Sequence, residues 1–176
     1  MTVAVREPDV AFTESAHRIL SGLVAAGAAL GWVEPPSRDE VADLLDRVAT
    51  AARAGDASLR AAYVDGRLAG LAYWLRYERP THRPHADLQK LAVDADAHGR
   101  GLGRALAAAL IADAREAGIE VLTLDARGDN TRALALYESL GFTEHGRLPD
   151  FVAVGERRYD KVLCMLDLRT GRADRP

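Results

Sequence analysis

Apolar residues recur at helical spacing in four parts of the chain. The segments are residues 15–31, 37–48, 101–117 and 129–140. Ser37, followed three residues later by Glu40, forms a capping box that marks the start of the second segment. Asp129 or Asn130 can cap the fourth segment. The pattern predicts four helices, with Gly27 and Gly31 closing the first one.

Short apolar runs bounded by turn residues predict strands between these helices. The runs are residues 2–6, 59–64, 68–77, 87–93, 119–124, 142–147 and 158–168. Asp65-Gly66 separates the second run from the third and is a strong hairpin signal. Pro149, Asp150 and Phe151 predict a loop between the last two strands.

The order of these elements predicts an α/β fold. The strand at 87–93, the helix at 101–117 and the strand at 119–124 have the lengths of a right-handed parallel crossover. The other strands follow one another closely, which favours antiparallel pairing. We therefore predict one domain over residues 1–168, with a mixed, mostly antiparallel sheet, a central parallel crossover and flanking helices. Residues 169–176 have the composition of a disordered tail.

Composition narrows the class of partner. The chain is 48% hydrophobic and 28% charged, with a net charge of −3, which is ordinary for a globular domain. It has no run of like charges typical of a nucleic-acid or membrane surface, and no apolar segment approaches about eighteen residues. We expect a small-molecule partner and neither nucleic acid nor membrane. Cys164 is the only cysteine, and no signal peptide opens the chain, so a cytoplasmic protein is expected.

The strongest chemical signal is His98-Gly99-Arg100-Gly101-Leu102-Gly103-Arg104, directly before the alanine-rich helix. Alternating glycines allow a ligand to approach the backbone closely. The start of the helix adds unpaired N–H groups and the positive end of its dipole, and two arginines add charge. These features suit a pyrophosphate. A flexible turn before the helix is the alternative that the segment alone leaves open.

The same residues exclude two other phosphate-binding motifs. A dinucleotide fingerprint would require glycine or alanine at position 104, which is occupied by Arg104. In addition, residues 94–98 separate the preceding strand from the glycines. A Walker-type loop would require Gly-Lys followed by Ser or Thr, and no such tripeptide follows the glycines.

Three motifs, in this order and spacing, resemble the GNAT superfamily of N-acetyltransferases. They are Leu91-Ala92-Val93, then after five residues Gly99-Arg100-Gly101-Leu102-Gly103-Arg104-Ala105-Leu106, and finally Asn130-x-x-Ala133-x-x-x-Tyr137-x-x-x-Gly141-Phe142. The resemblance is specific over residues 85–168 and weaker before residue 60. Within the superfamily, four segments are similar to the branch typified by tabtoxin-resistance acetyltransferases: His82-Arg83-Pro84, Gln89-Lys90-Leu91, Leu124-Asp125 and residues 20–32.

The resemblance implies acetyl-CoA as the cosubstrate. Backbone amides from Gly99 to Arg104 would hold its pyrophosphate, with charge added by Arg100 and Arg104. The strand Leu91-Ala92-Val93 would pair with the pantetheine amides as an added strand does. His98 departs from the family, which commonly has Gln or Arg there, and Asn130 is either a helix cap or a cofactor contact. The full set of implied cofactor-binding residues is Leu91, Ala92, Val93, His98, Gly99, Arg100, Gly101, Leu102, Gly103, Arg104, Asn130, Ala133 and Tyr137.

Tyr137 is the position that the family uses to protonate the departing CoA thiolate. A tyrosine with a pKa near 10 and a thiol with a pKa near 8.5 differ by about 1.5 units, so full proton transfer is uphill by roughly 2 kcal/mol. Hydrogen bonding to the developing thiolate is therefore as plausible as proton transfer. Simple packing on the apolar face of a helix is the alternative.

The acceptor amine must lose a proton before it attacks the thioester. For an amine with a pKa near 10.4, this costs on the order of 4 to 5 kcal/mol at pH 7, so a general base is useful. Asp125, at the end of the strand after the crossover, is the first candidate, and Asp87 on the preceding strand is the second. Either could instead bind the ammonium group or cap a turn. His82 and His85 lack the further ligands of a zinc site, so no metal is expected.

Three functions remain open at this point. The chain could acetylate a primary amine of a small amino-acid-like metabolite or toxin, or it could acetylate a protein or peptide amine with the same machinery. It could also be a non-catalytic acyl-CoA-binding module, which Tyr137 and Asp125 argue against. An exposed final strand could pair in a homodimer.

Overall fold

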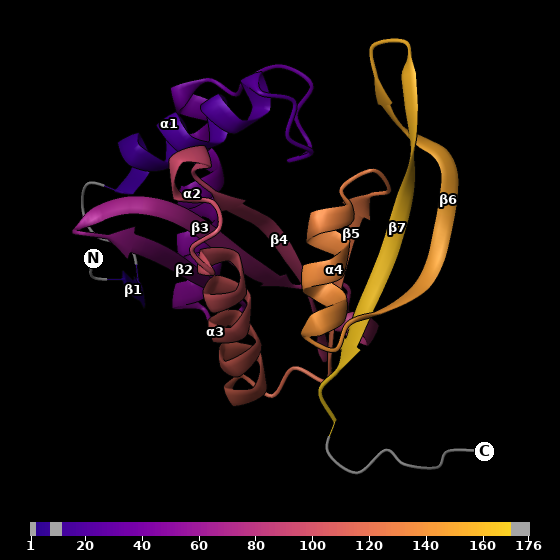
Figure 1. The fold of residues 1–176 in the computed structure, drawn as a ribbon. Helices are drawn as coiled ribbons and strands as arrows, with labels where there is room; N and C mark the ends of the chain where they lie inside the picture. Colours follow the sequence, from indigo (N-terminus) through magenta and orange to yellow (C-terminus); the bar gives the residue numbers. More distant parts are fainter. Residues whose placement is uncertain (1–2, 8–11, 170–176) are drawn as a thin grey trace.

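The computed structural model describes residues 3–7 and 12–169, which form a twisted sheet flanked by helices (Figure 1). The strands are β1 (Val3–Arg6), β2 (Ala57–Val64), β3 (Arg67–Arg76), β4 (His85–Val93), β5 (Val121–Arg127), β6 (Thr143–Val154) and β7 (Arg157–Asp167). The helices are α1 (Phe12–Ala25), α2 (Arg38–Arg53), α3 (Leu102–Glu116) and α4 (Thr131–Ser139), with short 3-10 turns at Pro80–His82 and Ala95–Ala97. None of the helices in these ranges is long and apolar enough to cross a membrane.

The sheet has the order β1-β2-β3-β4-β5-β7-β6. The pair β4–β5 is parallel, and the other neighbours are antiparallel. This confirms the predicted α/β class and the parallel crossover through α3. The parallel pairing is short, because it joins only His85–Asp87 to Val121–Thr123. Beyond these residues β4 and β5 part, and this separation creates the cleft described below.

Local sequence signals account for several element boundaries. Ser37 accepts a hydrogen bond from the Glu40 amide at 3.2 Å, and the Glu40 carboxylate accepts one from the Ser37 amide at 2.8 Å, so the predicted capping box is present. Asp65 and Gly66 both have positive φ, at 48° and 79°, as a two-residue hairpin turn of this kind requires. Asn130 caps α4 by accepting from the Ala133 amide at 3.3 Å.

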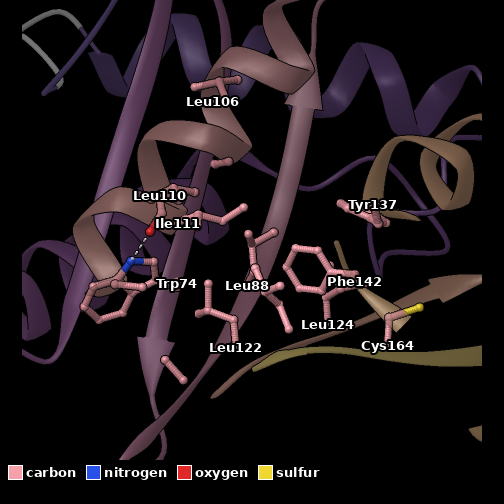
Figure 2. Close-up of a cluster of buried hydrophobic side chains, with 14 of the residues drawn as sticks. Trp74, Leu88, Leu106, Leu110, Ile111, Leu122, Leu124, Tyr137, Phe142 and Cys164 are labelled. Carbon is pink, nitrogen blue, oxygen red and sulfur yellow. Dashed lines mark hydrogen bonds between the residues drawn. The ribbon is translucent and has the colours of Figure 1, made fainter. Parts of the chain in front are cut away.

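Two apolar cores lie on the two faces of the sheet. The core beneath α3 contains Trp74, Leu88, Leu110, Leu122 and Phe142, which Figure 2 shows gathered around the middle of the sheet. The Trp74 indole donates to the Leu110 carbonyl at 3.2 Å, which satisfies its buried N–H group. On the opposite face, α1 and α2 cover a second core of buried residues from β2 and β3.

Several predicted boundaries are wrong. The strand predicted over 119–124 is β5, which runs from Val121 to Arg127, so Asp125 lies inside this strand and not at its end. The loop expected at Pro149, Asp150 and Phe151 is part of β6, which runs to Val154 before the hairpin turn. The pairing with β7 shifts between Leu148 and Val152, and Asp150 has a φ of 53°. Turn-forming residues therefore make an irregularity inside an edge strand, where a proline is tolerated.

The first helix is also shorter than its apolar pattern predicted. It ends at Ala25, and residues 26–36 form a connection to α2 in which Gly27 and Gly31 have φ values of 85° and 84°. Leu30, which continues the helical spacing, therefore lies in this connection. Thr2 and residues 170–176, the main part of the expected tail, lie outside the described residues.

Candidate functional site

A cleft of about 970 Å³ opens where β4 and β5 part. Its walls come from β4, the glycine loop, the start of α3, the end of β5, α4 and residues 26–31. It brings together these sequence-predicted residues: Leu91, Ala92, Val93, His98, Gly99, Gly101, Leu102, Gly103, Arg104, Asp125, Asn130, Ala133 and Tyr137, with Asp87 among its further lining residues. Arg100 is not among the lining residues, and its guanidinium donates to the Asp96 carbonyl at 3.3 Å.

The glycine loop has the conformation that a close ligand approach needs. Gly99 and Gly101 have φ values of 77° and 74°, and a Cβ placed on either would meet no atom within 4 Å. Gly101 is also the N-cap of α3, and no side chain caps the amides of this helix. The first turn of α3 therefore directs N–H groups toward the cleft without an internal acceptor, which is the arrangement that binds an anion.

Gly103 lies against α4 and β4, with room for a Cβ in ordinary van der Waals contact. A Cβ at this position would lie 3.4 Å from Leu136 Cδ2 and 3.9 Å from Val93 Cγ2. Nearby, Arg104 lines the cleft and donates from Nη2 to Ser139 Oγ at 2.6 Å. Together these contacts bring α4 close to the start of α3.

The remaining loop residues are also fixed by local contacts. The His98 ring nitrogen Nε2 lies 2.9 Å from the Val93 carbonyl oxygen, so this imidazole ties the loop to the end of β4. Asn130 uses its side-chain oxygen to cap α4. Both groups therefore have a structural contact in addition to their place on the cleft wall.

Tyr137 lies at the cleft with most of its ring buried. Its ring meets the edge of Phe142 at a centroid distance of 5.8 Å, and Figure 2 shows the two side by side above Leu124. Burial raises the pKa of Tyr137 to about 12. The hydroxyl is therefore protonated at every pH near neutrality, and it can act as a hydrogen-bond donor at the cleft wall.

Two carboxylates on neighbouring strands line the same cleft but differ in environment. Asp125 is 47% exposed and lies 3.1 Å from the Lys161 ammonium. Asp87 is mostly buried and accepts from Thr123 Oγ1 at 2.6 Å and from Gln89 Nε2 at 2.8 Å. Burial raises the pKa of Asp87 despite these two hydrogen bonds, and the negative charge of Asp125 adds to the rise.

Sequence reasoning did not anticipate the polar groups around Asp87. Thr123 Oγ1 lies 2.6 Å from the Tyr77 hydroxyl, and Tyr73 donates to Gln89 Oε1 at 3.3 Å. Thr123 is the register partner of Asp87 in the β4–β5 pair. The sequence does place Thr123 and Asp87 on the two strands of the predicted crossover. Their pairing can be recognised only once the register of these strands is known.

The residues that the structure describes contain no cluster of three or more metal-ligating side chains. His82 lies in the 3-10 turn after β3, where its ring stands edge-on to Tyr77 at 5.9 Å. The polar groups of the cleft include backbone amides, the phenol of Tyr137, the carboxylates of Asp87, Asp125 and Asp129, and cations.

Residues 27–142 match the model of the Acetyltransferase (GNAT) family. The ribosomal protein bS18-alanine N-acetyltransferase of Escherichia coli K12 is 39% identical over 83 residues, which cover 47% of this chain and 56% of that protein. The chain thus spans about half the length of the curated relatives it matches.

Solved structures agree with this result at the level of the fold. An N-acetyltransferase from Staphylococcus aureus Mu50 superposes with a TM-score of 0.87 at 19% identity, covering 96% of this chain and all of that one. A GNAT superfamily phosphinothricin acetyltransferase from Sinorhizobium meliloti, solved in complex with AcCoA, gives a TM-score of 0.85 at 23% identity and covers 100% and 94% of the two chains. The family match extends over more than half of the sequence, and the chain belongs to the GNAT acetyltransferase family.

Proposed function

We propose that this protein is an acetyl-CoA-dependent N-acetyltransferase whose acceptor is the primary amine of a small amino-acid-like molecule, and that residues 1–168 form the acetyltransferase domain. The observation that carries the proposal is one cleft that has an uncapped helix start, a buried phenol and the strand carboxylates Asp87 and Asp125 among its lining groups. Membership of the GNAT family supports the same reaction.

The residues present fit acetyl-CoA. The open space above Gly99 and Gly101 would accept the pyrophosphate, and Arg104 would add positive charge at the same end. Leu91, Ala92 and Val93 lie where β4 has left β5, so their backbone groups on the edge away from β3 are available to the pantetheine amides. Acetyl-CoA supplies a thioester whose carbonyl carbon bonds to the amine nitrogen as the bond to sulfur breaks. Tyr137 would donate a hydrogen bond to the departing sulfur.

The two carboxylates have different proposed roles toward the amine. A general base works best when its pKa approaches the working pH, and Asp87 is the carboxylate whose pKa is raised. Asp125 is more exposed and its negative charge is open to the cleft, which suits the binding of an ammonium group in competition with Lys161 before that group loses its proton. The environment thus favours Asp87 as the base, although the sequence alone placed Asp125 first.

The residues that line the cleft favour a small acceptor. Residues 26–31 line the same cleft as Asp87, Gln89 and Asp125, and they accept hydrogen bonds from Lys90 and Arg127 on the same two strands. Because this connection shares the wall of the cleft with the carboxylates, we place a small acceptor between them. A peptide amine is the second candidate, because a curated relative is named for acetylation of the alanine of ribosomal protein bS18.

Release of free thiol from acetyl-CoA tests the function. We expect turnover with phosphinothricin, an amino-acid-like amine named for a protein of the same fold. Turnover of phosphinothricin is compared with that of a peptide that begins with alanine and with that of the same peptide carrying a blocked N-terminal amine. Faster turnover with the free peptide than with phosphinothricin would favour the second candidate. Acetyl-CoA binding without thiol release in either case would favour a non-catalytic binding module.

Gly101→Val is expected to weaken acetyl-CoA binding by roughly tenfold or more, the effect of losing one hydrogen bond to a charged group. A branched side chain would occupy the open space above the loop, and the φ of 74° would add strain. Isothermal calorimetry with acetyl-CoA measures the loss.

The matched control for this loop variant is Gly118→Val. Gly118 has a φ of 69° and open space around its Cβ, but it lies after the other end of α3. The control therefore carries similar backbone strain without blocking the cleft. Equal affinities in the two folded variants would contradict the phosphate assignment.

A further inference from the structure

A bulge in β4 brings Lys90 to the acceptor side of the cleft. Leu71 of β3 pairs with Ala92, but Tyr73 pairs with Gln89, so two residues of β4 stand opposite Ala72. Lys90 is one of these two, and its φ is 51°, which is rare for a residue with a long side chain. The bulge resets the alternation of side chains along β4.

The burial pattern shows the result of this reset. Leu88 and Leu91, three residues apart, both pack in the core beneath α3, although strict alternation would place them on opposite faces. Ala92 packs in the core beneath α1 and α2. Lys90 is released from the α3 face and reaches the connection between α1 and α2.

Two contacts join Lys90 to that connection. Its ammonium donates a hydrogen bond to the Leu30 carbonyl, and it lies 4.1 Å from the centre of the Trp32 ring. A Cβ on Gly31 would approach the same nitrogen to 3.0 Å, so the backbone passes close beside it. A backbone carbonyl and an aromatic face together form a specific binding site for a cation.

A second cation reaches the same connection from β5. Arg127 donates from Nη2 to the Gly27 carbonyl at 3.4 Å, while Asp129 holds the guanidinium at 2.6 Å. The segment Gly27–Trp32 is thus contacted by Lys90 from β4 and by Arg127 from β5, the two strands that part at the cleft. Lys90 makes two of these contacts, with Leu30 and Trp32, and Arg127 makes one, with Gly27.

We propose that Lys90 is a positioning residue that fixes Gly27–Trp32 across the acceptor end of the cleft and thereby sets the affinity for the acceptor. The proposal rests on the proposed acetyltransferase function only for its kinetic consequence. Burial lowers the pKa of Lys90, but the charge of Asp125 opposes this shift. The proposed cosubstrate contacts, at Leu91–Val93 and the glycine loop, lie outside Gly27–Trp32, so we expect the effect to be confined to the acceptor.

Lys90→Met keeps the length of the side chain and removes its charge and its donors. We expect the KM for the amine acceptor to rise roughly tenfold, as for loss of one charged hydrogen bond, with acetyl-CoA affinity unchanged. Lys90→Arg should restore most of the affinity, because a guanidinium can also bond a carbonyl and stack on Trp32. The acceptor is phosphinothricin or the alanine peptide, whichever is turned over.

Collisional quenching of Trp32 by acrylamide tests the position of the segment without turnover. The chain has two tryptophans, and Trp74 is only 2% exposed, so Trp32→Phe identifies the accessible signal. Lys90→Met should increase quenching of Trp32. Lys161→Met, which alters the only other lysine, should leave quenching unchanged because Lys161 contacts Asp125 and Phe151 instead.

The outcomes distinguish the proposed role of Lys90 from the proposed function of the protein. Unchanged quenching in folded Lys90→Met would overturn the proposal, and so would an equal loss of affinity for acceptor and acetyl-CoA. A parent protein that turns over neither acceptor would contradict the proposed acceptors, while quenching would still decide whether Lys90 holds the segment. Thermal melting confirms that each variant is folded.

Discussion

Asp87→Asn is expected to lower kcat/KM for the amine acceptor by about 10²- to 10⁴-fold near neutral pH, the range found when a general base is removed. Asparagine keeps the shape of the side chain and can still accept from Thr123, but it cannot take a proton from the amine. Asp125→Asn is the matched variant on the neighbouring strand. We expect it mainly to raise the KM for the acceptor, because it removes charge that binds the ammonium group.

The pH dependence of the two variants identifies the base. A raised pKa means that Asp87 becomes protonated at a higher pH than an ordinary aspartate, so the acidic limb of the parent's profile should lie above the usual carboxylate range. Asp87→Asn should lose this limb and regain part of its relative rate as alkaline solution supplies neutral amine. If Asp125→Asn shows that recovery and Asp87→Asn runs parallel to the parent, Asp125 is the base instead.

Tyr137→Phe should reduce kcat by about 10²- to 10³-fold, which is the effect of removing one donor aimed at developing negative charge. The ring and its edge contact with Phe142 remain, so stability and acetyl-CoA affinity should change little. Single-turnover kinetics and calorimetry measure the two effects separately.

The control for Tyr137 is Tyr63→Phe. Tyr63 is a buried tyrosine on β2 that does not line the cleft, and its ring can still face Arg6 after the change.

Because burial raises the pKa of Tyr137 to about 12, an alkaline loss of activity well below that pH should persist in Tyr137→Phe. Full activity of Tyr137→Phe would assign this residue to packing alone.

Sequence reasoning reached the fold because its strongest signals are local. The capping box at Ser37, the turn at Asp65-Gly66 and the glycines before α3 each determine backbone geometry within a few residues. The parallel crossover follows from the lengths of consecutive elements. The wrong loop at Pro149 has a physical cause, because an edge strand can hold turn residues in a bulge without ending.

The residues of the candidate site could be predicted only where they belong to a motif with a characteristic spacing. The motifs around Gly101 and Tyr137 do, whereas the environments of Asp87 and Asp125 depend on strand register and burial. Lys90 had a weak signal, the spacing of three between Leu88 and Leu91, where strict alternation in a strand requires an even number. Only the folded chain shows that this spacing is a bulge.

The short pairing between β4 and β5 has a consequence for cooperativity. It divides the sheet into a part built from β1 to β4 and a part built from β5 to β7 with α4, which Figure 1 shows on opposite sides of the opening. Three register pairs and the shared core beneath α3 hold them together. A cosubstrate lying along Leu91–Val93 would add contacts that hold the two parts together. Binding would then suppress local opening at this seam and slow amide hydrogen exchange there more than in the two halves.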